Sequence, residues 1–181
     1  MVKLKIVVIG PKMSGKSTVS NFLSDAIDYN IEDYRPTQGV RILEFEIPQR
    51  KIEIELWDCS GDDKYENVWP VFLWEVNGVV LVFNPEEASQ LPELDRFYEN
   101  FVKKTILPHN NALVIANCKD TTMKPQTPEL SGSLANITYV NVNVLENGEA
   151  MRTAFEQFAS SIVIDTKEFG NEDISLLALP I

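Results

Sequence analysis

The segment Gly10–Ser17 constrains the fold of this chain more than any other part of its sequence. It reads GPKMSGKS and fits the phosphate-binding pattern G-x-x-x-x-G-K-[ST] at every fixed position. The β-branched run Val7–Ile9 comes directly before it, and apolar residues recur at helical spacing through about 16–26. The sequence therefore predicts a buried strand, a tight loop and a helix, in that order.

This loop has the residues that hold a phosphate. A chain that bends around a phosphate with its N–H groups pointing inward needs glycine where a side chain would collide. Lys16 is expected to reach the β- and γ-phosphates, and Ser17 to offer its hydroxyl to Mg²⁺ at the positive end of the helix. The alternative is a chance match in a Gly- and Ser-containing loop. The predicted nucleotide contacts from this loop are Gly10, Pro11, Lys12, Met13, Ser14, Gly15, Lys16, Ser17 and Thr18.

The remaining apolar pattern predicts an α/β fold. Two alternating segments flank Pro48-Gln49-Arg50 and are expected to pair as a hairpin. Later, continuous apolar runs separated by a helical stretch are typical of parallel strands that are covered on both faces. We expect strands at 41–47, 51–58, 79–83, 112–116 and 138–144, and helices at about 91–102 and 149–163. The domain is expected to span residues 1–165, with a C-terminal tail at 166–181.

Charge and composition exclude several partner classes. A formal net charge of −11 would repel nucleic acid and anionic lipid, so any phosphate must be held locally. The two cysteines, Cys59 and Cys118, are expected to be free thiols, because no secretory signal is present and the cytoplasm is the default compartment. Val2 and the ending Ala178–Ile181 carry no lipidation signal, so no direct lipid anchor is expected.

Two further segments supply candidate magnesium ligands. Trp57–Gly61 ends the second hairpin strand in the form W-D-x-x-G, which places Asp58 to hold magnesium through water and Gly61 to offer a bare N–H to a γ-phosphate. Upstream, Thr37 supplies a hydroxyl that completes the magnesium shell only while a γ-phosphate is present. Taken singly, Thr37 reads as a solvated loop residue and Asp58 as a turn former. Their order after the phosphate loop favours Ser17, Thr37 and Asp58 as the metal site.

A base-reading site is expected where the strand at 112–116 ends. Asn117-Cys118-Lys119-Asp120 follows it, and the carboxylate of Asp120 can accept both N1–H and N2–H of guanine. Adenine lacks that donor pair, so the wrong base would leave a buried group unpaired. Asn117 is expected to brace the loop. A polar turn at the end of a strand is the alternative reading of this tetrapeptide.

Together these residues resemble the small GTPase superfamily over nearly the whole chain. The segments 36–39 and 62–64 are similar to Arf-like members, whereas 36–46, 56–59 and Trp69-Pro70 more closely resemble the Rab-like GTPases of the intraflagellar transport B complex. The resemblance implies a three-layer P-loop GTPase domain, with a six-stranded, mostly parallel sheet and helices on both faces. It also implies GTP or GDP with Mg²⁺, coiled-coil subunits of that complex as partners, and a location in the cytoplasm and the cilium or flagellum, including basal body and axoneme.

The sequence departs from the superfamily pattern around the base and around the γ-phosphate. The usual N-K-x-D motif has lysine directly after asparagine, but here Cys118 takes that position and Lys119 comes one residue later, which predicts weakened guanine affinity. Asp62 stands where a glutamine usually orients the attacking water, and a carboxylate there repels the charge it should stabilise. Asp62 is thus an atypical candidate catalytic residue. Val144 lies about where a guanine-contacting loop is expected.

Several mechanisms are compatible with this reading. In one, the chain is a slow switch whose loops at Thr37 and Gly61 relax on hydrolysis; in another, GTP is chiefly a folding ligand of a fixed binding module with at most weak GTPase activity. An active Arf- or Rab-like switch in vesicle trafficking is the alternative. A third possibility is a P-loop kinase for a small acceptor, but this sequence has no arginine-rich segment that could form the lid of such an enzyme.

Trp69 is expected to be either a partner-binding anchor or ordinary core.

Overall fold

A six-stranded sheet forms the centre of the structure, a computed structural model that describes residues 1–26, 35–105, 107–119, 130 and 132–176. The strands are β1 (Val2–Ile9), β2 (Val40–Ile47), β3 (Ile52–Cys59), β4 (Gly78–Phe83), β5 (Ala112–Asn117) and β6 (Thr138–Val142). Their order is β2-β3-β1-β4-β5-β6, and every neighbouring pair is parallel except the β2–β3 hairpin. The predicted six-stranded, mostly parallel sheet is confirmed.

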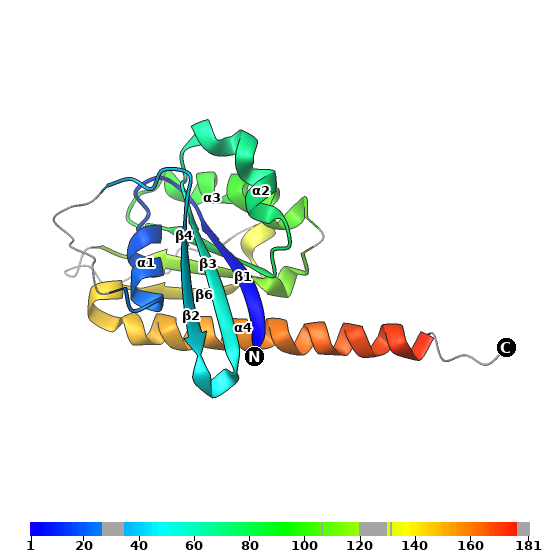
Figure 1. The fold of residues 1–181 in the computed structure, drawn as a ribbon. Coiled ribbons are helices and arrows are strands. Elements are labelled where there is room, and N and C mark those ends of the chain that lie inside the picture. The colour runs from blue at the N-terminus through cyan, green and yellow to red at the C-terminus, as the bar shows by residue number, and fades with distance from the viewer. Residues whose placement is uncertain (27–34, 106, 120–129, 131, 177–181) are drawn as a thin grey trace.

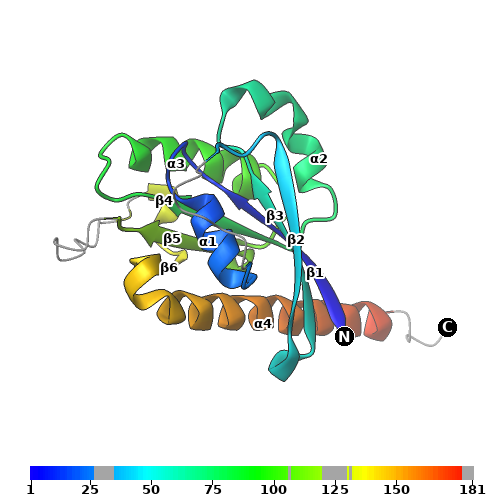
Figure 2. The ribbon, with the colours of Figure 1, turned by 60° about the vertical axis from the view of Figure 1, so that its left-hand side comes forward.

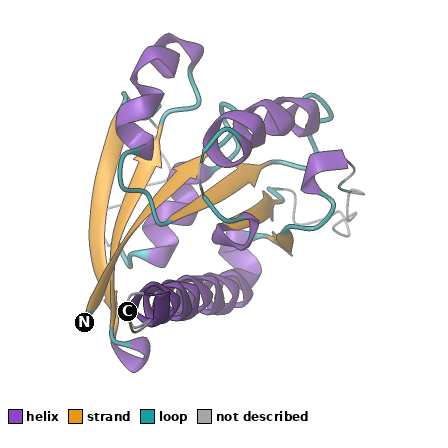
Figure 3. Ribbon diagram, turned by 90° about the vertical axis from the view of Figure 1, so that its right-hand side faces the viewer, coloured by secondary structure: helices purple, strands orange, loops and turns teal. Residues whose placement is uncertain are grey.

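Helices cover both faces of this sheet, which gives three layers (Figures 1 and 3). The helices are α1 (Lys16–Leu23), α2 (Trp69–Leu73), α3 (Gln90–Tyr98), which a π-helical turn (Glu99–Lys103) continues, and α4 (Val144–Leu176). Side chains of α1 and α4 share one apolar cluster with the sheet, and side chains of α2 and α3 share the other. Every residue of β4 and of β5 is buried, as expected for parallel strands between two helical layers.

The last helix is longer than the sequence pattern predicts. The predicted end of this helix near Val163 is wrong, because α4 continues to Leu176. It therefore crosses residue 166, where the C-terminal tail was expected to begin. The C-terminal part of α4 extends past the sheet (Figures 1 and 2). The predicted end rested on the apolar face that runs to Ile162, and the sequence after Asp165 is too polar to continue that pattern. No described helix is both long and apolar enough to cross a bilayer.

Of the two readings given for Trp69, the structure supports the core. Its side chain is 4% exposed and its ring lies 5.6 Å from that of Phe97 and 5.0 Å from that of Phe101, between α2 and α3. The exposed tryptophan of this region is Trp74, at 71%. The expectation that Trp69 anchors a partner therefore fails, because a helix on a sheet must bury one face and α2 buries this one.

Candidate nucleotide-binding site

A cavity of about 910 Å³ lies at the carboxyl ends of β1, β3, β5 and β6, among the loops that follow them. Ligands of open parallel sheets bind at this edge, because the loops after neighbouring strands converge there. Four of its sides come from segments that the sequence singled out: the phosphate loop, the loop before β2, the turn after β3 and the end of β5. The predicted contacts that line it are Lys12, Met13, Gly15, Lys16, Ser17, Thr18, Thr37, Gly61, Asp62, Asn117, Lys119 and Val144.

The phosphate loop has backbone angles and close contacts that require glycine. Gly10 has φ +151° and Gly15 has φ +93°, both in the region that side chains disfavour. A Cβ on Gly10 would overlap the carbonyl oxygen of Val82, and one on Gly15 would overlap the side-chain amide of Asn117. That amide also donates to the carbonyl oxygen of Ser14 over 3.3 Å. Asn117 thus braces the phosphate loop from β5, as expected.

Lys16, the first residue of α1, presents a buried cation at the end of this loop. Its side chain is 7% exposed, and its Nζ donates to the carbonyl oxygens of Gly10 (3.0 Å) and Pro11 (2.6 Å). Burial lowers the pKa of Lys16 to about 8, with the charge of Asp58 acting in the opposite direction. A Cβ on Gly61 would overlap the Gly10 carbonyl oxygen and lie 3.0 Å from Nζ, so the backbone at Gly61 packs directly on the lysine. An anion entering the cavity meets a cation that is already desolvated.

Three oxygen-bearing side chains meet beside that lysine. Ser17 Oγ and Thr37 Oγ1 lie 2.9 Å apart, and Thr37 Oγ1 lies 3.5 Å from Asp58 Oδ2. Asp58 is fully buried, and its Oδ1 has no hydrogen-bond partner among the described residues. Burial raises the pKa of Asp58, whereas the hydrogen bond from Ser17 and the nearby charge of Arg41 lower it. The structure therefore brings together all three predicted metal ligands.

This donor set suits magnesium. Mg²⁺ prefers oxygen ligands and is commonly held by one or two protein groups plus water and the phosphates of a nucleotide. The orphaned Asp58 Oδ1 is an acceptor that a metal-bound water would satisfy. Within the described ranges no three His, Cys, Asp or Glu side chains gather at a possible metal site. Ser17, Thr37 and, through water, Asp58 would hold such a metal, which would neutralise charge on the phosphates of a bound nucleotide.

Arg41 is a residue of this site that the sequence analysis missed. Its Nη2 donates to Asp58 Oδ2 (3.1 Å) and to Asn21 Oδ1 (2.6 Å), so it ties β2 to β3 and α1. The guanidinium compensates the charge of a carboxylate that would otherwise be buried alone. A signal was available, since Arg41 lies directly opposite Asp58 in the antiparallel register of β2 and β3. A hairpin register counted from the turn at 48–50 would have placed the two together.

The expected base-reading side of the cavity is lined by residues that follow β5 and by the start of α4. Cys118 is buried and its Sγ donates to Asn141 Oδ1 (3.0 Å) rather than reaching the phosphate loop. Lys119, one position later, donates from Nζ to the carbonyl oxygen of Met13 (2.5 Å), which braces that loop from the displaced position. Val144, at the start of α4, lines the cavity. Asp120, the predicted guanine acceptor, lies outside the described residues.

Comparisons with known proteins identify relatives of this chain. The model of the ADP-ribosylation factor family matches residues 1–162. An intraflagellar transport protein 22 homologue of Xenopus tropicalis is 38% identical over 183 residues, which cover 98% of this chain and all of that protein. The GDP-bound crystal structure of T. brucei IFT22 is 28% identical and superposes with a TM-score of 0.73, covering 91% of this chain and 98% of that one. The GTP-bound T. brucei IFT22/74/81 structure gives the same TM-score and identity, over 93% and 99%.

Proposed function

This chain belongs to the ADP-ribosylation factor family of small GTPases, and we propose that it serves as a guanine-nucleotide-binding subunit of the intraflagellar transport B complex. In this proposal the chain holds GTP or GDP with Mg²⁺, hydrolyses GTP slowly at most, and docks on coiled-coil partner subunits in the cytoplasm and the cilium or flagellum. A crystal structure of the T. brucei relative with IFT74/81 and GTP supports the choice of partner. One observation carries the nucleotide part: the Ser17, Thr37 and Asp58 oxygens meet beside the buried ammonium of Lys16.

Slow hydrolysis follows from the chemistry of Asp62. Hydrogen bonding from the backbone N–H of Lys64, with a smaller contribution from Lys12, holds the pKa of Asp62 below its usual range. The ionised carboxylate accepts hydrogen bonds but donates none. It therefore lacks the amide donor with which a glutamine orients an attacking water, and its charge opposes the charge of the transferred phosphoryl group.

The proposal is tested by single-turnover hydrolysis of bound GTP and by partner binding. We expect a rate constant below about 10⁻⁴ s⁻¹, slower than the roughly 3–5 × 10⁻⁴ s⁻¹ of an unstimulated relative of this fold that has the glutamine. Partner affinity is measured by calorimetry with GDP-loaded and GTP-loaded protein. Equal affinity for the two forms ends the switch hypothesis and leaves the nucleotide-loaded binding module. A rate constant at or above that of the relative would instead contradict slow hydrolysis and favour the active trafficking switch.

Asp58 is expected to make nucleotide release depend on magnesium. In the unaltered protein, chelating Mg²⁺ should accelerate release of a fluorescent GDP analogue at least about tenfold, because the metal links Ser17 and Asp58 to the phosphates. In Asp58→Asn the same treatment should change the release rate less than about threefold, since an amide holds a metal-bound water more weakly than a carboxylate. Asp63→Asn is the matched control, because Asp63 is 65% exposed and pairs with Arg96. A full tenfold response in Asp58→Asn contradicts the assignment.

A further inference from the structure

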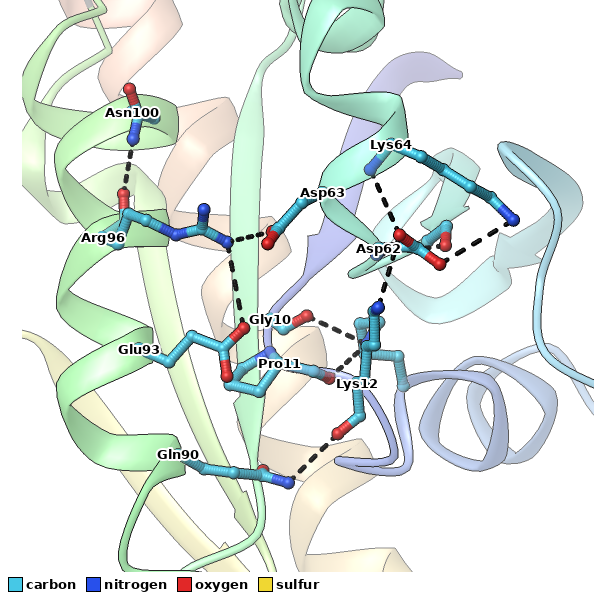
Figure 4. A network of polar contacts seen from close by, with 12 residues as sticks. Gly10, Pro11, Lys12, Asp62, Asp63, Lys64, Gln90, Glu93, Arg96 and Asn100 are labelled. Carbon is cyan, nitrogen blue, oxygen red and sulfur yellow. Dashed lines mark hydrogen bonds and ion pairs between the residues drawn. The ribbon is translucent and has the colours of Figure 1, made fainter.

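An ion pair spans the cavity between the phosphate loop and the turn after β3. Lys12 Nζ lies 3.3 Å from Asp62 Oδ1, and both residues line the cavity (Figure 4). Asp62 is also approached by Lys64, whose Nζ lies 3.7 Å from Oδ2 and whose backbone N–H donates to Oδ1 over 3.1 Å. The phosphate-binding pattern leaves position 12 open, so neither member of the pair is required by the motif.

The phosphate loop is fastened at Lys12. Gln90, the first residue of α3, donates from Nε2 to the carbonyl oxygen of Lys12 (3.1 Å) and accepts from the backbone N–H of Asn84 (2.7 Å). Gln90 is 6% exposed, so this brace is buried. It fixes the backbone from which the lysine side chain extends toward Asp62 (Figure 4).

Asp62 is fastened as well. Its backbone N–H donates to Ser60 Oγ (3.3 Å), and its side chain caps the 3₁₀ helix Asp63–Val68. It directly follows Gly61, whose backbone packs on Gly10 and Lys16. The carboxylate is therefore held next to the end of the phosphate loop at which Lys16 would receive the β- and γ-phosphates.

We propose that the Lys12–Asp62 ion pair determines how well the site accepts a nucleoside triphosphate relative to a diphosphate. The inference rests on the proposed function, because it assigns these residues to the γ-phosphate end of the same site. An ionised carboxylate beside a terminal phosphate repels it, and the repulsion falls on the triphosphate because a diphosphate has no group there. Lys12 offsets the negative charge of Asp62. The site can therefore accept the γ-phosphate of GTP, which the carboxylate alone would repel.

Three variants test this account by calorimetry with GDP and with a non-hydrolysable GTP analogue, both in excess Mg²⁺. Lys12→Met should lower the affinity for the triphosphate relative to GDP by roughly three- to tenfold, the range for partly exposed charges. Asp62→Asn should raise that ratio by a similar factor. The double variant should keep the raised ratio of Asp62→Asn to within about twofold, because Lys12 acts through Asp62 and has nothing to offset once that carboxylate is gone.

Lys103→Met is the matched control, since it removes one exposed lysine from an ion pair with Glu99 outside the cavity. Its triphosphate-to-diphosphate ratio should equal that of the unaltered protein. Lys12 is 60% exposed, so its replacement should not lower the melting temperature.

Two results would overturn the inference. One is an unchanged ratio in both single variants. The other is a loss in Lys12→Met that persists in the Asp62→Asn background, which would mean that Lys12 contacts the phosphate directly. Failure of the unaltered protein to bind either nucleotide would instead reject the proposed function, so the two failures are distinguishable.

Discussion

The Lys16→Met variant is expected to lose about three orders of magnitude in affinity for both GTP and GDP, because each charge-assisted hydrogen bond to a phosphate contributes roughly 1.5–3 kcal/mol. The ammonium of Lys16 is buried against backbone carbonyls. The free-energy cost of removing it from water therefore falls on folding and not on nucleotide binding. Methionine fills a similar volume without a charge. We therefore expect the melting temperature of the nucleotide-free variant to match or exceed that of the unaltered protein.

The measurement is calorimetric titration of each nucleotide into nucleotide-free protein, with circular dichroism melting as the test of folding. Lys3→Met is the control, because Lys3 is half exposed and pairs with glutamates on the sheet away from the cavity. A folded Lys16→Met protein that binds GDP within about tenfold of the unaltered affinity would contradict the role of Lys16 as the phosphate-holding cation.

Replacing Trp69 with alanine is expected to lower the free energy of unfolding by about 3–5 kcal/mol, the range for removing a large buried aromatic side chain. The indole fills the space between α2 and α3 against Phe97 and Phe101, and the guanidinium of Arg96 lies 5.7 Å from the ring. Denaturant unfolding monitored by circular dichroism measures the loss. Nucleotide affinity should change much less, since Trp69 does not line the cavity.

Trp69→Phe is the matched control for this prediction. The indole N–H has no hydrogen-bond partner among the described residues, so phenylalanine removes an unsatisfied donor while keeping an aromatic ring. We expect it to cost clearly less than Trp69→Ala, because the phenyl ring keeps most of the buried volume of the indole. Should Trp69→Ala leave stability intact and abolish partner binding, Trp69 would be an interface anchor and its place in the core would be wrong.

The sheet could be predicted because its strands are short apolar runs with distinct flanks. Val79–Phe83 and Ala112–Ala116 are buried on both faces, and burial of that kind leaves a continuous hydrophobic signal. The hairpin was equally plain, because two alternating segments flank Pro48-Gln49-Arg50. The extension of α4 beyond Val163 was missed, since the apolar stripe in the sequence does not continue past Ile162 in a helical pattern.

Some residues of the candidate site were likewise predictable from the sequence, and others were not. Gly10, Gly15 and Lys16 were predictable because phosphate binding demands those residue types at fixed spacing. Arg41 was missed although the hairpin register places it opposite Asp58. The Lys12–Asp62 pair was not predictable, because it joins two segments whose relative placement depends on the path of their loops. Lys119 shows the limit of reading a motif by position alone, since it contacts the phosphate loop from one residue later than expected.

The central claim is that a loop of backbone amides, together with Lys16 and a magnesium site at Ser17 and Asp58, binds the phosphates of a guanine nucleotide. Calorimetric titration of GTP and GDP into the folded, nucleotide-free chain in the presence of Mg²⁺ tests it most directly. We predict saturable one-to-one binding of both nucleotides, with dissociation constants of about 10 μM or below. A folded chain that gives no binding heat with either nucleotide and whose melting temperature neither nucleotide raises would contradict the claim.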